Sequence, residues 1–248
     1  MFKMMFKMMM TSLMCAVGVA ALVAPAPLGA QDASPTAAPP DFTGVYYRTQ
    51  ASGTLGGDGE DGGPVARPPK LAPEYMAKRE VMRKSREGGS SEFDPNARCI
   101  PQGMPSMMGM IYGMEIQHTK DRITMYGELN DSYRRIYLDG RKPSQKVLDD
   151  PTYAGYSTGH WEGDTLVVDT VALRPDSLIG GFSPHSDQMT VKERIRFTGP
   201  RVLEDRITVS DPKALLEPHE SVLAYRKAFP PYDELREFAC AEGLPNAK

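Results

Sequence analysis

The amino-acid sequence predicts an all-β protein with one short helix, folded as an antiparallel β-barrel or a strongly curved sheet. Beyond Cys99, short runs of alternating apolar and polar residues recur with turn residues between them, which is typical of antiparallel strands. Helical signals mark one segment, residues 73–87. About eight or nine such strands in one chain favour a barrel over an alternation of helices and strands.

The composition excludes several classes of protein. The 248 residues include 29 Lys and Arg against 32 Asp and Glu. No basic face carries clustered aromatic residues, so we expect no nucleic-acid partner. The charged fraction of 25% and the hydrophobic fraction of 40% are those of a globular chain rather than a fibrous or disordered one. The sequence contains no phosphate-binding loop or dinucleotide fingerprint. We therefore expect no cofactor and assign no metal ligand.

Residues 1–30 have the pattern of a secretory signal peptide. Lys3 and Lys7 precede an apolar run between Leu13 and Val23, which is about half of the roughly 20 residues that a bilayer core requires. We place the cleavage after Ala30. The mature protein is then expected to be periplasmic or secreted, with no membrane contact.

The remaining chain is predicted to consist of a flexible leader, residues 31–40, and a single domain, residues 41–248. The leader is rich in Ala, Pro, Ser and Thr, a composition that cannot bury a core. Three segments open the domain: a first strand at 41–47, a Gly/Pro-rich loop at 52–70 and a helix at 73–87.

The predicted helix is delimited by Pro73 at its start and Gly88 just past its end. Its five basic side chains are interpreted as a solvated face. The strands that follow are predicted at residues 114–119, 122–129, 132–138, 158–162, 165–171, 187–198, 202–209 and 221–229.

Cys99 and Cys240 are the two cysteines that remain once the signal peptide, with Cys15, is removed. An oxidising compartment favours disulfides, so we predict that these two cysteines pair. The alternative is two separate buried thiols.

The clearest alternation predicts the register of one hairpin. If residues 199–201 form its loop, Ile195 faces Asp205 and Glu193 faces Ile207, while the remaining inward pairs are apolar on both strands. Glu193 and Asp205 then become diagonal neighbours on an otherwise apolar inner face, within roughly 7 to 8 Å.

Two inward acids require compensation by a raised pKa, an inward arginine or a wet cavity. Arg135 is the candidate partner, because we expect Tyr133, Arg135 and Tyr137 on the inner face of their strand and Arg134 on the outer face. One interpretation is a structural ion pair that closes the barrel end. The other is that the two acids serve as general acid and base around an apolar ligand, which the Arg and the two Tyr help to bind.

Two histidines suggest further sites. His160 is expected diagonal to Asp169 across a hairpin, as a second acid–base candidate, and the alternative is an exposed strand histidine. His185 and Asp187 share a face at a strand entrance, which leaves acid, base or metal-ligand roles open. Ser186 points to the opposite face, so this trio is not a nucleophilic triad.

A methionine-rich segment lies among Pro and Gly residues. We interpret it as a pliable apolar lip over the barrel mouth, because Met fills irregular gaps and adapts to varied ligands. The alternative is soft ligation of Cu(I) by thioethers. The methionines are Met104, Met107, Met108, Met110 and Met114, of which Met107, Met108 and Met110 are the candidate ligand contacts.

Four strings carry a resemblance, at Cys99–Pro105, Arg135–Arg141, Gly159–Thr170 and Pro184–Asp187. They are similar to a large family of exported bacterial proteins of unassigned function, found mainly in Gram-negative organisms. The resemblance extends over about residues 41–242. Members of that family often carry His where this chain has Tyr156 or Thr190, so the resemblance implies no metal site at those two positions.

The first strand also resembles the opening of lipocalin-type barrels, in which a Gly-x-Trp signature closes one end. Here Gly44 is followed by Tyr46 and Tyr47 in place of the Trp. The resemblance implies a lipocalin-like barrel at the level of the fold.

Together these features favour an exported barrel that binds a small apolar or aromatic molecule in its interior, gated by the methionine-rich segment. If the protein is an enzyme, we expect cofactor-free proton transfer of the lyase, isomerase or dehydratase type. The alternatives are a ligand carrier without turnover and a copper-handling protein that uses the methionines.

Overall fold

The structure is a computed structural model that describes residues 38–49, 68–238 and 240. The described residues belong to one compact unit, Ala37–Lys248. The predicted signal peptide, most of the predicted leader and most of the Gly/Pro-rich loop lie outside the described residues.

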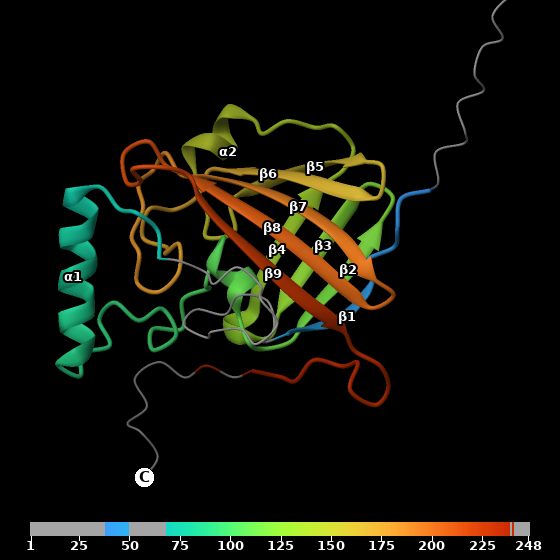
Figure 1. The fold of residues 1–248 in the computed structure, drawn as a ribbon, viewed down its shortest axis with the longest axis horizontal. Coiled ribbons are helices and arrows are strands. Elements are labelled where there is room, and N and C mark those ends of the chain that lie inside the picture. The colour runs from blue at the N-terminus through green and yellow to red at the C-terminus, as the bar shows by residue number, and fades with distance from the viewer. Residues whose placement is uncertain (1–37, 50–67, 239, 241–248) are drawn as a thin grey trace, which may run out of the picture. The chain divides into compact units, whose positions relative to one another are not determined.

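Within the described part of the chain, nine strands close into a barrel (Figure 1), which confirms the predicted fold class. Each strand pairs with the next one along the chain, and the last pairs with the first. The strands are β1 (Gly44–Arg48), β2 (Met114–Thr119), β3 (Arg122–Gly127), β4 (Ser132–Tyr137), β5 (Tyr156–Glu162), β6 (Thr165–Val171), β7 (Thr190–Gly199), β8 (Val202–Ser210) and β9 (His219–Lys227).

One strand pair departs from the expected antiparallel arrangement. β4 and β5 run parallel and pair at Ile136 with Ser157 and at Tyr137 with Thr158. Antiparallel neighbours need only a hairpin turn, whereas parallel neighbours need a long connection. That connection carries a short helix, α2 (Gln145–Asp149), which the sequence analysis did not identify.

The helix α1 (Pro73–Glu87) has the predicted bounds and lies outside the barrel (Figure 1). Its Tyr75 is buried, and the basic residues form exposed ion pairs within the helix, such as that between Lys78 and Glu74. In the described residues, no helix has the length and apolar character needed to cross a bilayer.

The hairpin of β7 and β8 has the predicted register. Ile195 pairs with Asp205 and Glu193 with Ile207. The apolar pairs that flank them also form as expected, so the inner face of this hairpin is apolar apart from the two acids.

Cys99 and Cys240 form the predicted disulfide across a sequence separation of 141 residues. The bond ties the segment before the methionine-rich region to residues beyond β9.

Aromatic rings seal one end of the barrel. Phe42 is fully buried, and its ring centroid lies 5.3 Å from that of Trp161, 5.2 Å from that of Phe197 and 6.0 Å from that of His118. Tyr46, one of the two residues in place of the lipocalin Trp, donates its hydroxyl to the Phe42 carbonyl at 2.8 Å. We call these rings, Phe42, His118, Trp161 and Phe197, the aromatic closure.

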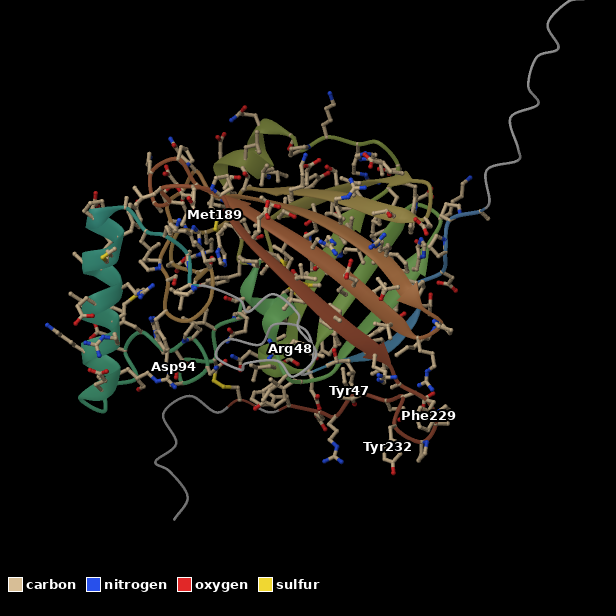
Figure 2. The ribbon with its side chains drawn as sticks, viewed as in Figure 1. Tyr47, Arg48, Asp94, Met189, Phe229 and Tyr232 are labelled. Carbon is tan, nitrogen blue, oxygen red and sulfur yellow. A yellow bond between two sulfur atoms is a disulfide. The ribbon has the colours of Figure 1, made fainter. Side chains whose placement is uncertain are left out.

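The methionine-rich segment covers the opposite end, the barrel mouth. It contains a short 3-10 helix, η1 (Ser106–Gly109), and its carbonyls accept hydrogen bonds from Tyr225 and Arg48 of the flanking strands. Figure 2 shows Met189 at this end, where β7 begins, and Phe229 and Tyr232 beyond the other end of β9. Four methionines of the segment are buried in the core, Met104, Met107, Met108 and Met114.

Candidate functional site

A charge cluster occupies the middle of the barrel. Arg134 and Glu193 are both buried and form a bidentate ion pair, with Nη1 2.8 Å from Oε1 and Nη2 in contact with Oε2. Arg134 also donates from Nε to Ser157 at 3.0 Å and from Nη2 to Thr170 at 2.9 Å. The ion pair therefore has the saturated hydrogen bonding that burial of charge requires.

Asp205 lies in the same layer and differs from Glu193 in every contact. It is fully buried, and neither carboxyl oxygen has a hydrogen-bond partner among the described residues. Burial is the main cause that raises the pKa of Asp205 well above its ordinary value, and the negative charge of Glu193 adds to it, while Arg134 opposes the shift. Asp205 thus keeps its proton to a higher pH than an ordinary aspartate does.

The arginine that pairs with Glu193 is Arg134, and the expectation that Arg135 would pair with the inward acids is wrong. Arg135 is exposed and lies over the ring of Tyr133, 5.1 Å from its centroid. Tyr133 is 56% exposed. The inner face of β4 consists instead of Ser132, Arg134 and Ile136, and the expected aromatic face points outward.

The histidine and aspartate of the second predicted pair are on the outer surface. Trp161 shares the inner face with the aromatic closure, so His160 points out, as the register of β5 with β6 requires. The His160 ring lies 3.4 Å from Glu162, whereas Asp169 pairs with Lys192 at 3.3 Å. The predicted diagonal placement of His160 and Asp169 is present on the outer face, and each side chain contacts a different partner there.

His185 and Asp187 also separate. His185 is buried, with Nε2 2.7 Å from the Ser177 hydroxyl and Nδ1 2.7 Å from the Ser186 carbonyl. Burial lowers the pKa of His185, so the ring is neutral near pH 7. Asp187 is exposed and pairs with Lys213. These contacts fix the loop that precedes β7.

The methionines are arranged for packing. Sδ of Met108 lies 4.0 Å from Nη1 of Arg134, and a guanidinium cation beside the sulfur opposes the binding of a copper ion there. Across the described residues, no group of three His, Cys, Asp or Glu side chains is arranged to hold a metal.

A cavity of about 460 Å³ lies at the barrel mouth. Its apolar floor is formed by Ile207 and Val209 of β8 and Leu223 of β9, and Met110 lines its rim. The few polar groups include Arg48, labelled in Figure 2, and the half-buried His219 and Ser221 at the start of β9. We call this space the mouth cavity.

A second hollow, of about 480 Å³, lies where β4 and β5 meet. We call it the seam groove. It is lined by three of the side chains predicted to bind a ligand from the inner face, Tyr133, Arg135 and Tyr137, and by Met107. A further groove of about 640 Å³ lies between α1 and the loop that contains His185. Neither Glu193 nor Asp205 lines any of these three spaces.

Two features of these sites were missed by sequence reasoning. Arg134 had a detectable signal, because it shares its face with Ile136, the aliphatic residue that pairs with Ile123 of β3. The mouth cavity had none, since its lining comes from segments that are far apart in the sequence.

No protein-family model matches the chain, and no curated protein matches it either.

Proposed function

We propose that this protein is an exported β-barrel that binds a small apolar or aromatic molecule in the mouth cavity. The observation that carries the proposal is a cavity of about 460 Å³ with an apolar floor of barrel side chains. Small-molecule sites commonly have about 300 to 1,000 Å³ and combine apolar walls with a few polar groups.

The apolar and the polar residues that line the mouth cavity have different roles in binding. Ile207, Val209 and Leu223 provide apolar surface, whose burial drives binding by the hydrophobic effect. Arg48 and His219 supply the polar groups that orient a ligand. Met110 lines the rim, and its flexible thioether side chain adapts to ligands of different shape.

Fluorescence titration with N-phenyl-1-naphthylamine, a neutral apolar aromatic probe, tests this proposal. We expect saturable binding that Ser221→Phe weakens at least tenfold, because the larger side chain fills the cavity that Ser221 lines. The matched control is Thr208→Phe on the neighbouring strand, at a position that lines none of the three spaces. The absence of saturable binding, or an equal loss in both variants, contradicts the proposal.

A second candidate function is cofactor-free acid–base chemistry at Asp205. Leu223 pairs directly with Asp205 across the strands, and Ile207 is its next neighbour on the same face. Both residues line the mouth cavity, so Asp205 lies next to its lining, and proton transfer to a bound molecule requires one of these two side chains to move aside.

Hydrogen–deuterium exchange into a bound molecule identifies such chemistry. Native mass spectrometry first identifies the molecule that purifies with the protein, which is then incubated with the protein in D₂O. If Asp205 transfers a proton, Asp205→Asn abolishes deuterium incorporation and leaves affinity unchanged. Deuterium incorporation that persists in the variant excludes Asp205 as the proton-transfer group. Binding without incorporation in the wild type supports a carrier without turnover.

A further inference from the structure

The seam groove exists because the sheet splits between β4 and β5. The two strands pair at two positions, Ile136 with Ser157 and Tyr137 with Thr158. Within the part of the chain that the structure describes, residues 132–135 of β4 have no partner strand on this side, since β5 begins only at Tyr156. The connection from β4 to β5 runs along the outer edge of the gap and encloses the groove.

The walls of the groove are rich in tyrosine. Tyr133 and Tyr137 come from β4, while Tyr153 and Tyr156 come from the end of the connection and the start of β5. The rings of Tyr137 and Tyr156 lie 5.1 Å apart at an interplanar angle of 32°. Such rings offer large flat surfaces on which another planar ring can stack.

Two of the residues that line the groove, Gly103 and Gly155, are glycines. Gly103 and Gly155 have φ values of 68° and 66°, a backbone conformation that favours glycine. A Cβ atom at Gly103 would lie 2.6 Å from the Tyr153 carbonyl oxygen, and one at Gly155 would lie 2.7 Å from that of Val171. Glycine at these two positions therefore allows the backbone segments that line the groove to pack closely against Tyr153 and the end of β6.

The acidic side chains of the rim have their own partners. Asp131 accepts a hydrogen bond from the Tyr126 hydroxyl. Asp150 interacts electrostatically with Arg174, whose pKa it helps to raise. Each of the two acids therefore has an attractive contact within the protein.

The basic side chains of the rim have no such polar contact within the described residues. Arg135 makes a cation–π contact with Tyr133. In the described parts of the chain, neither Arg135 nor Lys146 donates a hydrogen bond to an acceptor or forms an ion pair. A guanidinium offers five N–H donors, which suits a planar carboxylate.

We infer that the seam groove is a second binding site, which takes a planar aromatic molecule carrying a carboxylate. The ring stacks against the tyrosines, and the carboxylate accepts hydrogen bonds from Arg135 and Lys146. This site is separate from the mouth cavity and prefers an anion, so the two sites bind different classes of molecule.

Isothermal titration with three matched probes tests the inference. The probes are 2-naphthoate, 2-naphthylmethanol with the same ring and no charge, and cyclohexanecarboxylate with the charge and no aromatic ring. We expect 2-naphthoate to bind about tenfold more tightly than either of the others, with an affinity that falls as salt is added.

The double variant Arg135→Gln/Lys146→Gln should weaken 2-naphthoate binding about tenfold, since each exposed ion pair contributes modestly. The control Arg226→Gln/Lys120→Gln removes the same charge from side chains that do not line the groove and should leave affinity within twofold. Ser221→Phe at the mouth should also leave it unchanged.

Three results overturn the inference. They are equal affinity for the alcohol and the carboxylate, no effect of the Arg135 and Lys146 substitutions, and loss of 2-naphthoate binding in Ser221→Phe. The last result assigns the aromatic acid to the mouth cavity and leaves the proposed function standing, whereas failure of the neutral probe at the mouth contradicts that function alone.

Discussion

Arg134 and Arg135 are adjacent on β4 and have opposite environments. Arg134 is buried and saturated with acceptors from Glu193, Ser157 and Thr170. Arg135 is exposed, and its described contact is with an aromatic ring. The comparison shows that the charge on the inner face of β4 is paired within the barrel, while the charge on the outer face at the seam has an aromatic ring as its described contact.

The largest expected difference between the two faces is in stability. Arg134→Met leaves Glu193 buried without a counter-charge, and we expect it to lower the free energy of unfolding by about 3 to 5 kcal/mol. Arg135→Met should change it by no more than about 0.5 kcal/mol. Urea denaturation of both variants measures the difference.

The double variant Arg134→Met/Glu193→Leu tests the cause. Removal of both charges should recover most of the lost stability, because no unpaired ion remains. Equal destabilisation by Arg134→Met and Arg135→Met would show that the two faces do not differ in this way.

The same contrast holds on β5. Trp161 belongs to the aromatic closure, so Trp161→Ala should cost about 3 kcal/mol through lost apolar contacts and a cavity. His160→Ala on the outer face should cost no more than about 0.5 kcal/mol. Thermal unfolding followed by near-ultraviolet circular dichroism measures both changes, and similar melting temperatures would contradict this role of the closure.

The pH dependence of stability tests whether the pKa of buried Asp205 is raised in the folded protein. Because its folded-state pKa is raised, Asp205 stabilises the fold at low pH, and this contribution is lost as pH rises from the unfolded pKa toward the folded one. Buried His185 has a lowered pKa and acts in the opposite direction, losing stability as pH falls.

Comparison of Asp205→Asn with the wild type isolates the aspartate, since His185 contributes equally to both. The free energy of unfolding of the variant should rise relative to that of the wild type between pH 4 and pH 8. A constant difference for Asp205→Asn would mean that this carboxyl titrates normally.

The smallest effect concerns a single hydroxyl at the mouth. The Tyr225 hydroxyl donates to the Met108 carbonyl at 2.6 Å. Tyr225→Phe should cost about 1 kcal/mol and increase amide hydrogen exchange in residues 106–110, whereas Tyr133→Phe on the outer face should change neither. Unaltered exchange in the Tyr225 variant would show that other contacts hold the segment in place.

Local patterns determined what the sequence could predict. The register of β7 with β8 followed from a three-residue loop and strict alternation, and both are contained within about twenty residues. The disulfide was predicted because two cysteines remain when the predicted signal peptide is left out. These inferences needed no knowledge of which distant segments meet.

Which face of β4 points into the barrel could not be predicted in the same way. The residues before it form a 3-10 turn, with Asn130 and Asp131 at φ values of 52° and 46°, and this turn sets which face points inward. Tyr133 and Tyr137 of β4 are large and aromatic, as many core residues are, and this composition favoured the wrong face. The aromatic closure and the mouth cavity bring together segments far apart in the chain, which single-sequence periodicity does not report.

The single parallel contact between β4 and β5 follows from parity. In a closed ring of strands, direction can alternate all the way round only when their number is even. With nine, as in the described barrel, at least one adjacent pair must run the same way. A closed barrel with an odd number of strands therefore has at least one parallel pair. A binding site can evolve at that pair without a change in the interior of the barrel.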